Sequence, residues 1–305
     1  MHTYFSHKKH PSTVFNMKSL SVEESKEPAL TVSSIEDEAR RPYRLGIALS
    51  GGGARGFAHA GALKAIEEAG LKPDIIAGVS AGAVAAVLYA AGIPADEIMP
   101  RFSKKFSDYC KLSIREGDGL FSLTKMKKFL VANTGVENLE DLGIPTYIGV
   151  TDFDHGVPAV FSSGPLGERV CASCSIPIVF RPVRIDGVNY VDGGVLRNLP
   201  AWTIRDKCHR LIGINCSPLT NYRYKKSLFD VAMRTYNLMA KSNQEADMAM
   251  CDLVIKTPEL AKYQVFNLKD IQKVYLSGYA AAHRAIKDWI AADPEVQKIL
   301  TEKRP

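Results

Sequence analysis

The stretch IIAGVSAGAVAAVLYAA, residues 75–91, carries the most information about the fold and the function of this chain. It begins with a short apolar run, passes through the pattern G-x-S-x-G at 78–82, and continues into good helix formers. A strand, a sharp turn and a helix in this order form the context in which that pattern presents a nucleophilic serine. Gly78 and Gly82 leave room for a strained turn and for close packing. Ser80 is therefore the first candidate catalytic residue.

A glycine-rich turn, SGGGARG at residues 50–56, lies upstream, between an apolar run at 45–49 and a helical pattern at 57–69. Its three consecutive glycines are Gly51, Gly52 and Gly53. Without side chains, such residues let several backbone N–H groups point into one space. At the start of a helix this arrangement suits an anion, either a phosphate or the oxyanion of an acyl-transfer intermediate.

Other interpretations of this turn remain open. Gly51, Gly53 and Gly56 also satisfy G-x-G-x-x-G, the pattern of dinucleotide-binding sites. That interpretation expects an acidic residue closing a second strand, whereas Asp74 opens one. The turn lacks the Gly-Lys-Ser/Thr ending of a Walker loop. A tight turn without any ligand is the third alternative.

A carboxylate follows downstream, in VNYVDGG at residues 188–194, where Asp192 ends a short apolar run before Gly193 and Gly194. Taken alone, Asp-Gly indicates a hairpin turn. Beside a serine elbow and a glycine nest, a carboxylate at the end of a strand becomes a candidate general base. The carboxyl ends of parallel strands share one edge of a sheet, so we expect all three groups to meet there.

Histidine is the usual partner of a catalytic serine, and the chain has seven. His209 and His283 follow Asp192, so the order serine, acid, histidine excludes neither. Their settings, a polar link and a helical pattern, favour surface or packing roles. His59 lies close to the glycine-rich turn, and we expect it to pack beneath that turn.

Together these blocks resemble the patatin-like phospholipases. GGGARGFAHAG at 51–61 resembles that family's oxyanion loop and the helix after it. ASCSIPIVFRPV at 172–183 and VNYVDGGVLRNLPA at 188–201 resemble two further blocks of the family. The resemblance spans roughly residues 43–256.

The resemblance implies a Ser–Asp dyad without histidine, with Ser80 as nucleophile and Asp192 as general base. It implies an oxyanion hole formed by the backbone amides of Gly51, Gly52 and Gly53. The supporting motif positions are Arg55, Gly56, Gly78, Gly82, Gly193 and Gly194.

The implied activity is that of a serine lipid acyl hydrolase, of the phospholipase A or lysophospholipase type, which forms an acyl-serine intermediate. The alternatives are an acyltransferase with the same dyad and a non-catalytic lipid-binding regulator. We expect a lipid or phospholipid ester as substrate, no cofactor and no metal.

The apolar and helical patterns alternate, which predicts the α/β class with a mostly parallel central sheet. The resemblance implies a three-layer α/β/α patatin-like fold. We expect an extension without stable structure at 1–42, a catalytic domain at 43–256, and a helical segment packed on it at 257–305. The expected strands are 45–49, 75–78, 146–151, 158–162, 188–191, 210–216 and 253–256. The expected helices are 57–69, 83–91, 95–107, 123–132, 166–174, 200–206, 228–249 and 277–291.

Two further segments carry weaker signals. The helix at 228–249 has an apolar stripe at spacings of three and four, which indicates core packing and leaves open a face toward the substrate. Its members are Phe229, Ala232, Met233, Tyr236, Met239 and Ala240. Residues 117–123, with Phe121, are a candidate lid.

Composition is ordinary for a globular protein, with 46% apolar and 24% charged residues among 305 and a net charge of +6. The first residues lack the apolar core of a signal peptide, so we expect a cytoplasmic protein that contacts anionic membrane surfaces peripherally. The candidate basic patches are Lys104-Lys105, Lys125 to Lys128 and Arg223 to Lys226. No nucleic-acid-binding module is visible. Cys171 and Cys174 form a C-x-x-C without a second pair, and we interpret them as core cysteines.

Overall fold

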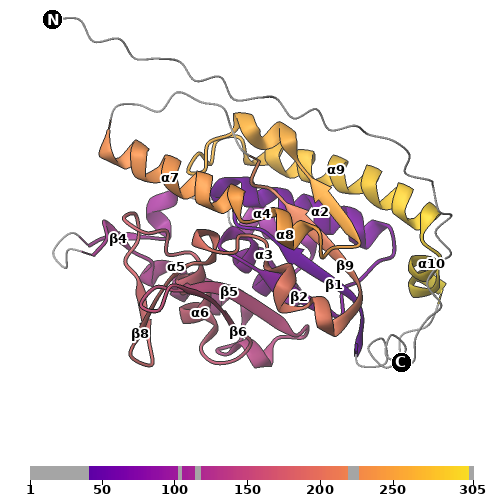
Figure 1. The fold of residues 1–305 in the computed structure, drawn as a ribbon, viewed down its shortest axis with the longest axis horizontal. Coiled ribbons are helices and arrows are strands. Elements are labelled where there is room, and N and C mark those ends of the chain that lie inside the picture. Colours follow the sequence, from indigo (N-terminus) through magenta and orange to yellow (C-terminus); the bar gives the residue numbers. More distant parts are fainter. Residues whose placement is uncertain (1–40, 102–104, 114–117, 219–226, 302–305) are drawn as a thin grey trace, which may run out of the picture.

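A computed structural model of the chain describes residues 41–101, 105–113, 118–218 and 227–301 (Figure 1). Its main element is an eight-stranded sheet in the order β10-β9-β1-β2-β5-β8-β7, with β6 paired to β5. These strands are β1 (Tyr43–Leu49), β2 (Ile75–Gly78), β5 (Thr146–Asp152), β6 (Val157–Phe161), β7 (Val183–Ile185), β8 (Val188–Asp192), β9 (Cys208–Asn215) and β10 (Leu253–Lys256). The expected mixed α/β fold with a mostly parallel central sheet is confirmed.

The sheet is parallel from β10 to β5, whereas β6, β7 and β8 run antiparallel to their neighbours. Leu49 at the end of β1 pairs with Gly78 at the end of β2. The glycine-rich turn and the serine elbow therefore leave adjacent strands at the same edge. Asp192 reaches this edge differently from our expectation, because β8 is antiparallel and the register places Asp192 opposite Val150 of β5.

Most of the helices pack on one face of the sheet and form a thick layer. The other face is covered by a thinner layer. The helices are α2 (Phe57–Glu68), α3 (Ala81–Ala90), α4 (Ala95–Arg101), α5 (Thr124–Thr134), α6 (Leu166–Ser173), α7 (Leu228–Ser242), α8 (Glu245–Met248), α9 (Ile271–Ala292) and α10 (Pro294–Thr301). Leu45, Ile47 and Leu49 pack under the thick layer, in one core with residues of α2, α3, α5, α6 and α9. Ala48 of β1 and Ala77 of β2 face the thin layer. That layer consists of α8 and two short 3₁₀ helices, η6 (Pro200–Thr203) and η7 (Arg205–Lys207).

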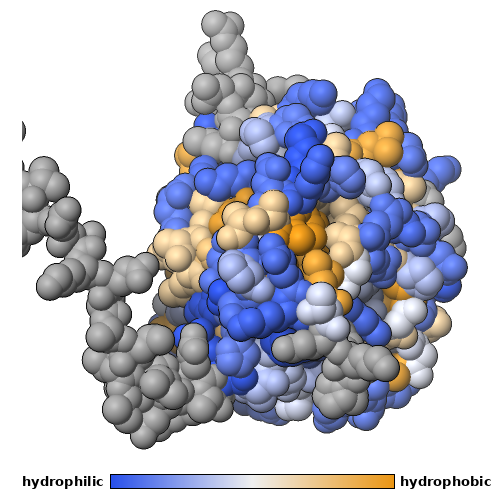
Figure 2. Space-filling view, turned by 90° about the vertical axis from the view of Figure 1, so that its right-hand side faces the viewer, coloured by the Kyte–Doolittle hydropathy of each residue, from blue (hydrophilic) through white to orange (hydrophobic). Residues whose placement is uncertain are grey.

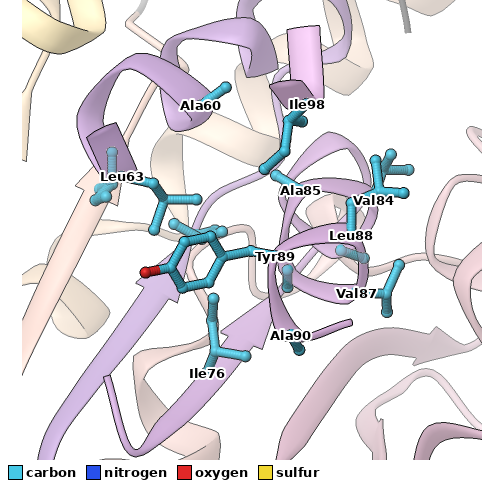
Figure 3. Close-up of a cluster of buried hydrophobic side chains, with 14 of the residues drawn as sticks. Ala60, Leu63, Ile76, Val84, Ala85, Val87, Leu88, Tyr89, Ala90 and Ile98 are labelled. Atoms are coloured by element: carbon cyan, nitrogen blue, oxygen red, sulfur yellow. The ribbon is translucent and has the colours of Figure 1, made fainter. Parts of the chain in front are cut away.

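The core of the thick layer is built from small and branched side chains (Figure 3). Side chains of α2, α3 and α4 point toward one another there, with Ile76 of β2 beneath them. The alanine-rich sequence of α3 lets it lie close to the sheet, which explains why nearly all of this helix is buried. α3 begins immediately after Ser80, so its burial fixes the position of the elbow.

The long helix α9 lies along α2 (Figure 1). Gly61 of α2 faces the backbone of Tyr275, and Gly278 of α9 faces the backbone of Ala58, with no room for a Cβ at either position. Asp293, between α9 and α10, forms an ion pair with Arg210 of β9, with Nε and Oδ2 2.8 Å apart. The end of the molecule that carries α10 is mostly hydrophilic, with a small apolar area (Figure 2). This end lies at the amino-terminal edge of the parallel strands, away from Ser80.

Several expected elements end differently in the structure. The helix expected at 95–107 ends at Arg101, and the helix expected at 228–249 is divided into α7 and α8. The helix expected at 200–206 consists of η6 and η7. The strands β3 (Lys111–Leu112), β4 (Phe121–Ser122) and β7 were missed, because each has only two or three residues.

Some predictions lie outside the described residues: the extension up to residue 40, Lys104, the patch from Arg223 to Lys226, and the first residue of the candidate lid. The described part of the candidate lid contains β4, which pairs with β3. Within the described part of the chain, no helix is both long and apolar enough to cross a membrane.

Candidate active site

Ser80 occupies a strained turn between β2 and α3. Its φ of 53° and ψ of −121° lie outside the regions that residues with side chains prefer. Its N–H donates to Ser173 Oγ at 2.8 Å, and Ser173 Oγ donates in turn to the carbonyl of Gly149 at 2.7 Å. The strained residue is thus held by a side chain of α6 and by β5.

The glycines of the elbow are required by space. A Cβ on Gly78 would collide with the carbonyl of Gly82, and a Cβ on Gly82 would collide with the carbonyl of Leu49. Gly56 is similarly pressed against Ala81. The glycine-rich turn and the serine elbow therefore pack on each other directly.

The glycine-rich turn lies beside Ser80, but its three amides are not equivalent. A Cβ on Gly51 would lie 3.3 Å from Ser80 Cβ. The N–H of Gly51 donates to the carbonyl of Asn198 at 3.1 Å, which removes it from the expected set of oxyanion donors. The N–H groups of Gly52 and Gly53 have no acceptor among the described residues. The structure thus leaves two of the three predicted donors available.

Asp192 is fully buried beside the hydroxyl of Ser80. Its Oδ1 accepts a hydrogen bond from the N–H of Gly194 at 2.8 Å. Burial raises the pKa of Asp192 to about 6, against the opposing effects of the Ser80 hydroxyl, the Gly194 N–H and the Tyr236 hydroxyl. Asp192 Oδ2 has no hydrogen-bond partner within the described chain.

The remaining motif positions have structural roles. A Cβ on Gly193 would lie 2.8 Å from the carbonyl of Gly149, so this glycine allows the turn after Asp192 to lie on β5. Arg55 points away from Ser80: its Nε donates to the carbonyl of Tyr263 at 2.8 Å and its Nη1 donates to that of Pro218 at 3.3 Å. Burial lowers the pKa of the Arg55 guanidinium.

His59 lies beneath the glycine-rich turn, as expected. Its Nε2 donates to the carbonyl of Ser50 at 2.7 Å, because a carbonyl can only accept. Complete burial lowers the pKa of His59 to about 4, so the ring is neutral near pH 7. The ring also contacts Cys216 Sγ at 3.2 Å, and it supports the turn.

The sequence analysis missed several residues around the dyad. The Tyr236 hydroxyl lies against Gly194 and beside the Asp192 carboxylate, and the apolar stripe of its helix was the only signal for it. Asn243, just after α7, accepts from the N–H of Asn198 at 2.9 Å and donates to the carbonyl of Gly194 at 3.1 Å. The end of α7 thus holds the loop that follows Asp192.

A pocket lined mainly by apolar side chains opens at Ser80, and we call it the apolar pocket. Its lining is formed by Gly53, Ala54, Gly56, Phe57, Ala60, Ser80, Ala81, Val84, Ala85, Ile98, Tyr109, Leu123, Met126, Cys174, Ile176, Phe180, Val265, Phe266 and Leu268. A smaller pocket on the other side of the glycine-rich turn has a mixed lining, and we call it the polar pocket. Its residues are Gly52, Gly53, Arg55, Ile176, Ser217, Pro218, Tyr236, Asn237, Ala240 and Val265.

The two cysteines of the C-x-x-C motif are free thiols. Burial raises the pKa of Cys171 to about 12 and that of Cys174 well above its usual range. Cys174 lines the apolar pocket beside Ser80. No group of three or more metal-ligating side chains occurs among the residues that the structure describes.

Comparison with known proteins finds relatives that match about half of this chain. Lysophospholipase nte1 of Aspergillus fumigatus is 32% identical over 161 residues, which are 51% of this chain and 11% of that protein. Neuropathy target esterase sws of Drosophila melanogaster is 32% identical over 165 residues, 52% of this chain and 12% of that protein. An uncharacterised NTE family protein of Mycobacterium bovis, Mb1092c, is 35% identical over 161 residues, 52% of this chain and 44% of that protein. The matches thus span much less than the full length of these relatives.

A solved structure shares the fold at low sequence identity. The crystal structure of VipD from Legionella pneumophila aligns with a TM-score of 0.51 at 14% identity, covering 81% of this chain and 67% of that one. The family model described as patatin-like phospholipase matches residues 47–204, which include the glycine-rich turn, Ser80 and Asp192. This chain therefore belongs to the patatin-like phospholipase family.

Proposed function

We propose that this protein hydrolyses carboxylic esters of lipids, with Ser80 as nucleophile and Asp192 as general base. The observation that carries the proposal is the juxtaposition of a strained serine, a buried carboxylate and two amides without acceptors at the mouth of an apolar pocket. The names of two relatives, a lysophospholipase and an esterase, support an ester substrate. We further propose that lysophospholipids, which carry one acyl chain, are the substrate class.

The reaction begins when Ser80 Oγ attacks the ester carbonyl carbon and its proton passes to Asp192. A pKa of about 6 makes this carboxylate a stronger base than an ordinary aspartate while leaving it mostly charged at pH 7. The N–H groups of Gly52 and Gly53 stabilise the oxyanion, as does the amino-terminal end of α3.

Collapse of this intermediate breaks the bond to the alcohol, which leaves with the proton held by Asp192. The acyl group stays on Ser80. A water molecule then attacks the acyl-serine and gives its proton to Asp192, and the fatty acid departs as Ser80 Oγ recovers that proton. An apolar pocket that excludes water strengthens these electrostatic interactions.

The test is hydrolysis of p-nitrophenyl butyrate and lauroyl-lysophosphatidylcholine by the wild type, Ser80→Ala and Asp192→Asn. The activity of each variant should fall by about 10⁴-fold or more, because either change disrupts the Ser80–Asp192 dyad that forms the acyl-enzyme. Circular dichroism should show the native fold in both variants. Undiminished hydrolysis by a folded variant would contradict the dyad.

We also propose that α5 brings the site to anionic membrane surfaces. Met126 of this helix lines the apolar pocket, whereas Lys125, Lys127 and Lys128 are exposed. A basic residue near an anionic surface contributes about 1 kcal/mol. Co-sedimentation with vesicles containing phosphatidylserine should weaken in Lys125→Glu/Lys128→Glu, and unchanged binding would refute this contact.

A further inference from the structure

The segment Tyr263 to Leu268, which we call the strap, joins the glycine-rich turn from a distant part of the chain. It lies between η8 (Pro258–Lys262) and α9, beyond the residues that the family model matches. The carbonyl of Val265 accepts a hydrogen bond from the N–H of Ala54 at 2.7 Å. The carbonyl of Tyr263 accepts from Arg55 Nε at 2.8 Å. Two backbone groups of the strap are therefore fixed to consecutive residues of the turn.

The strap also packs on the residue that carries one of the free amides. Gly53 has a φ of +56°, and a Cβ on it would lie 2.5 Å from the carbonyl of Val265. Only glycine combines this backbone conformation with such a close approach. The position of the Gly53 amide beside Ser80 therefore depends on the strap.

The side chains of the strap separate the two pockets. Val265, Phe266 and Leu268 are half-buried and line the apolar pocket. Val265 also lines the polar pocket, and it shares this double position only with Gly53 and Ile176 among the lining residues. Beyond Val265 the polar pocket is lined by Tyr236, whose hydroxyl lies beside the Asp192 carboxylate, and by Asn237, whose Nδ2 donates to the carbonyl of Met233 at 2.7 Å.

We propose that the strap sorts the two halves of the ester: its apolar side chains select the acyl chain, and the polar pocket behind Val265 receives the leaving alcohol. This inference rests on the proposed function. Burial of an acyl chain is favourable against apolar surface, whereas a glycerol-like alcohol needs hydrogen-bonding partners when it is removed from water. The two pockets meet at Gly53, whose amide is one of the two proposed oxyanion donors.

The first arm of the test changes the apolar side. In Phe266→Ala, the ratio of kcat/KM for p-nitrophenyl laurate to that for p-nitrophenyl butyrate should fall about tenfold, because the longer chain loses apolar contacts with the pocket lining. The activity on butyrate should fall less than the activity on laurate, because a four-carbon chain makes fewer contacts with the pocket. Leu268→Ala is a second variant for the same ratio. Leu276→Ala is the control, since this leucine of α9 is 52% exposed and lines neither pocket.

The second arm changes the polar side. Asn237→Leu keeps the size of the side chain and removes its amide. The ratio of kcat/KM for lauroyl-lysophosphatidylcholine to that for p-nitrophenyl laurate should fall about tenfold. These esters share the acyl chain and differ in the alcohol, so the ratio reports on the alcohol side alone. The laurate-to-butyrate ratio should not change in this variant, and the alcohol ratio should not change in Phe266→Ala.

The outcomes separate this inference from the proposed function. If the wild type hydrolyses these esters but neither ratio moves in folded variants, the strap has no role in sorting and the proposed function stands. If both variants alter both ratios equally, the pockets are not divided and the inference is also wrong. If the wild type hydrolyses none of these esters, the proposed function fails and takes this inference with it.

Discussion

The two parts of the molecule that meet at Ser80 are encoded in different ways. Residues 47–204 supply Ser80, Asp192 and the glycine-rich turn, each within a recognisable motif. Residues beyond 204 supply Tyr236, Asn243 and the strap, and none of these lies in a motif. Motifs arise where the backbone must adopt a geometry that only glycine permits. A supporting contact needs only a suitable side chain in the right place, so its sequence is freer.

The ion pair between Arg197 and Asp247 joins the two parts, and its removal should have the largest effect. Asp247 is completely buried, with its Oδ2 2.8 Å from Arg197 Nε. Arg197→Met should lower the free energy of unfolding at pH 7 by about 3–5 kcal/mol, because a buried carboxylate loses its partner. Thermal denaturation measures this loss.

The pH dependence of this loss gives a second check. Burial raises the pKa of Asp247 and Arg197 opposes that effect, so the pKa should rise further in the variant. A raised pKa in the folded state contributes stability at low pH that disappears as the pH increases. The variant should therefore recover stability toward pH 4. Arg210→Met, at the more exposed pair with Asp293, should lower the free energy of unfolding less. Equal losses in the two variants would contradict the role of the Arg197–Asp247 pair in joining the two parts.

Gly53→Ala tests whether the strap and the turn act as one unit. The added methyl group collides with Val265 and displaces the Gly53 amide. Loss of one oxyanion donor should lower kcat by about 100- to 1,000-fold. Gly135→Ala is the matched control, since Gly135 also has a positive φ, of 73°, but has open space around its Cβ position. Similar activity per folded molecule in the two variants would show that Gly53 is not required for catalysis.

Ser173→Ala examines the support of the elbow inside the family core. The change removes the acceptor for the Ser80 N–H and the donor to Gly149 in a fully buried place. It should reduce the free energy of unfolding by about 1–3 kcal/mol, measured by urea denaturation. A neutral effect would mean that α3 alone holds Ser80 in its strained conformation.

Tyr236→Phe has the smallest expected effect and tests the contribution of α7. The Tyr236 hydroxyl favours the charged form of Asp192, so its loss should raise the pKa of that carboxyl above about 6. The acid limb of kcat/KM should then move to higher pH, with a loss of about twofold at pH 7 and recovery at alkaline pH. Tyr279→Phe, whose hydroxyl contacts Glu68, should leave the profile unchanged. A uniform loss at every pH would argue for a structural role instead.

The sequence predicted the sheet and the elbow because these depend on local patterns, whereas the pairing of Ser80 with Asp192 was implied by the family resemblance and remains a proposal. The apolar runs around Ser80 and Asp192 are short and bounded by glycines, so their strands were predicted within one or two residues. The commitment of the Gly51 amide to Asn198 was not predictable, since it depends on how two distant turns meet. Tyr236 was recognised only as a member of an apolar stripe, because nothing in its helix indicates which residue faces a carboxylate.

The most direct measurement is the rate of Ser80 labelling by a fluorophosphonate between pH 4 and pH 9, with the adduct located by peptide mass spectrometry. A base with a pKa of about 6 predicts one adduct on Ser80, formed at a constant rate above pH 7 and progressively more slowly below pH 6. Asp192→Asn should abolish this labelling. An adduct at another residue, or a rate on Ser80 that does not change with pH, would contradict a Ser80 nucleophile activated by Asp192.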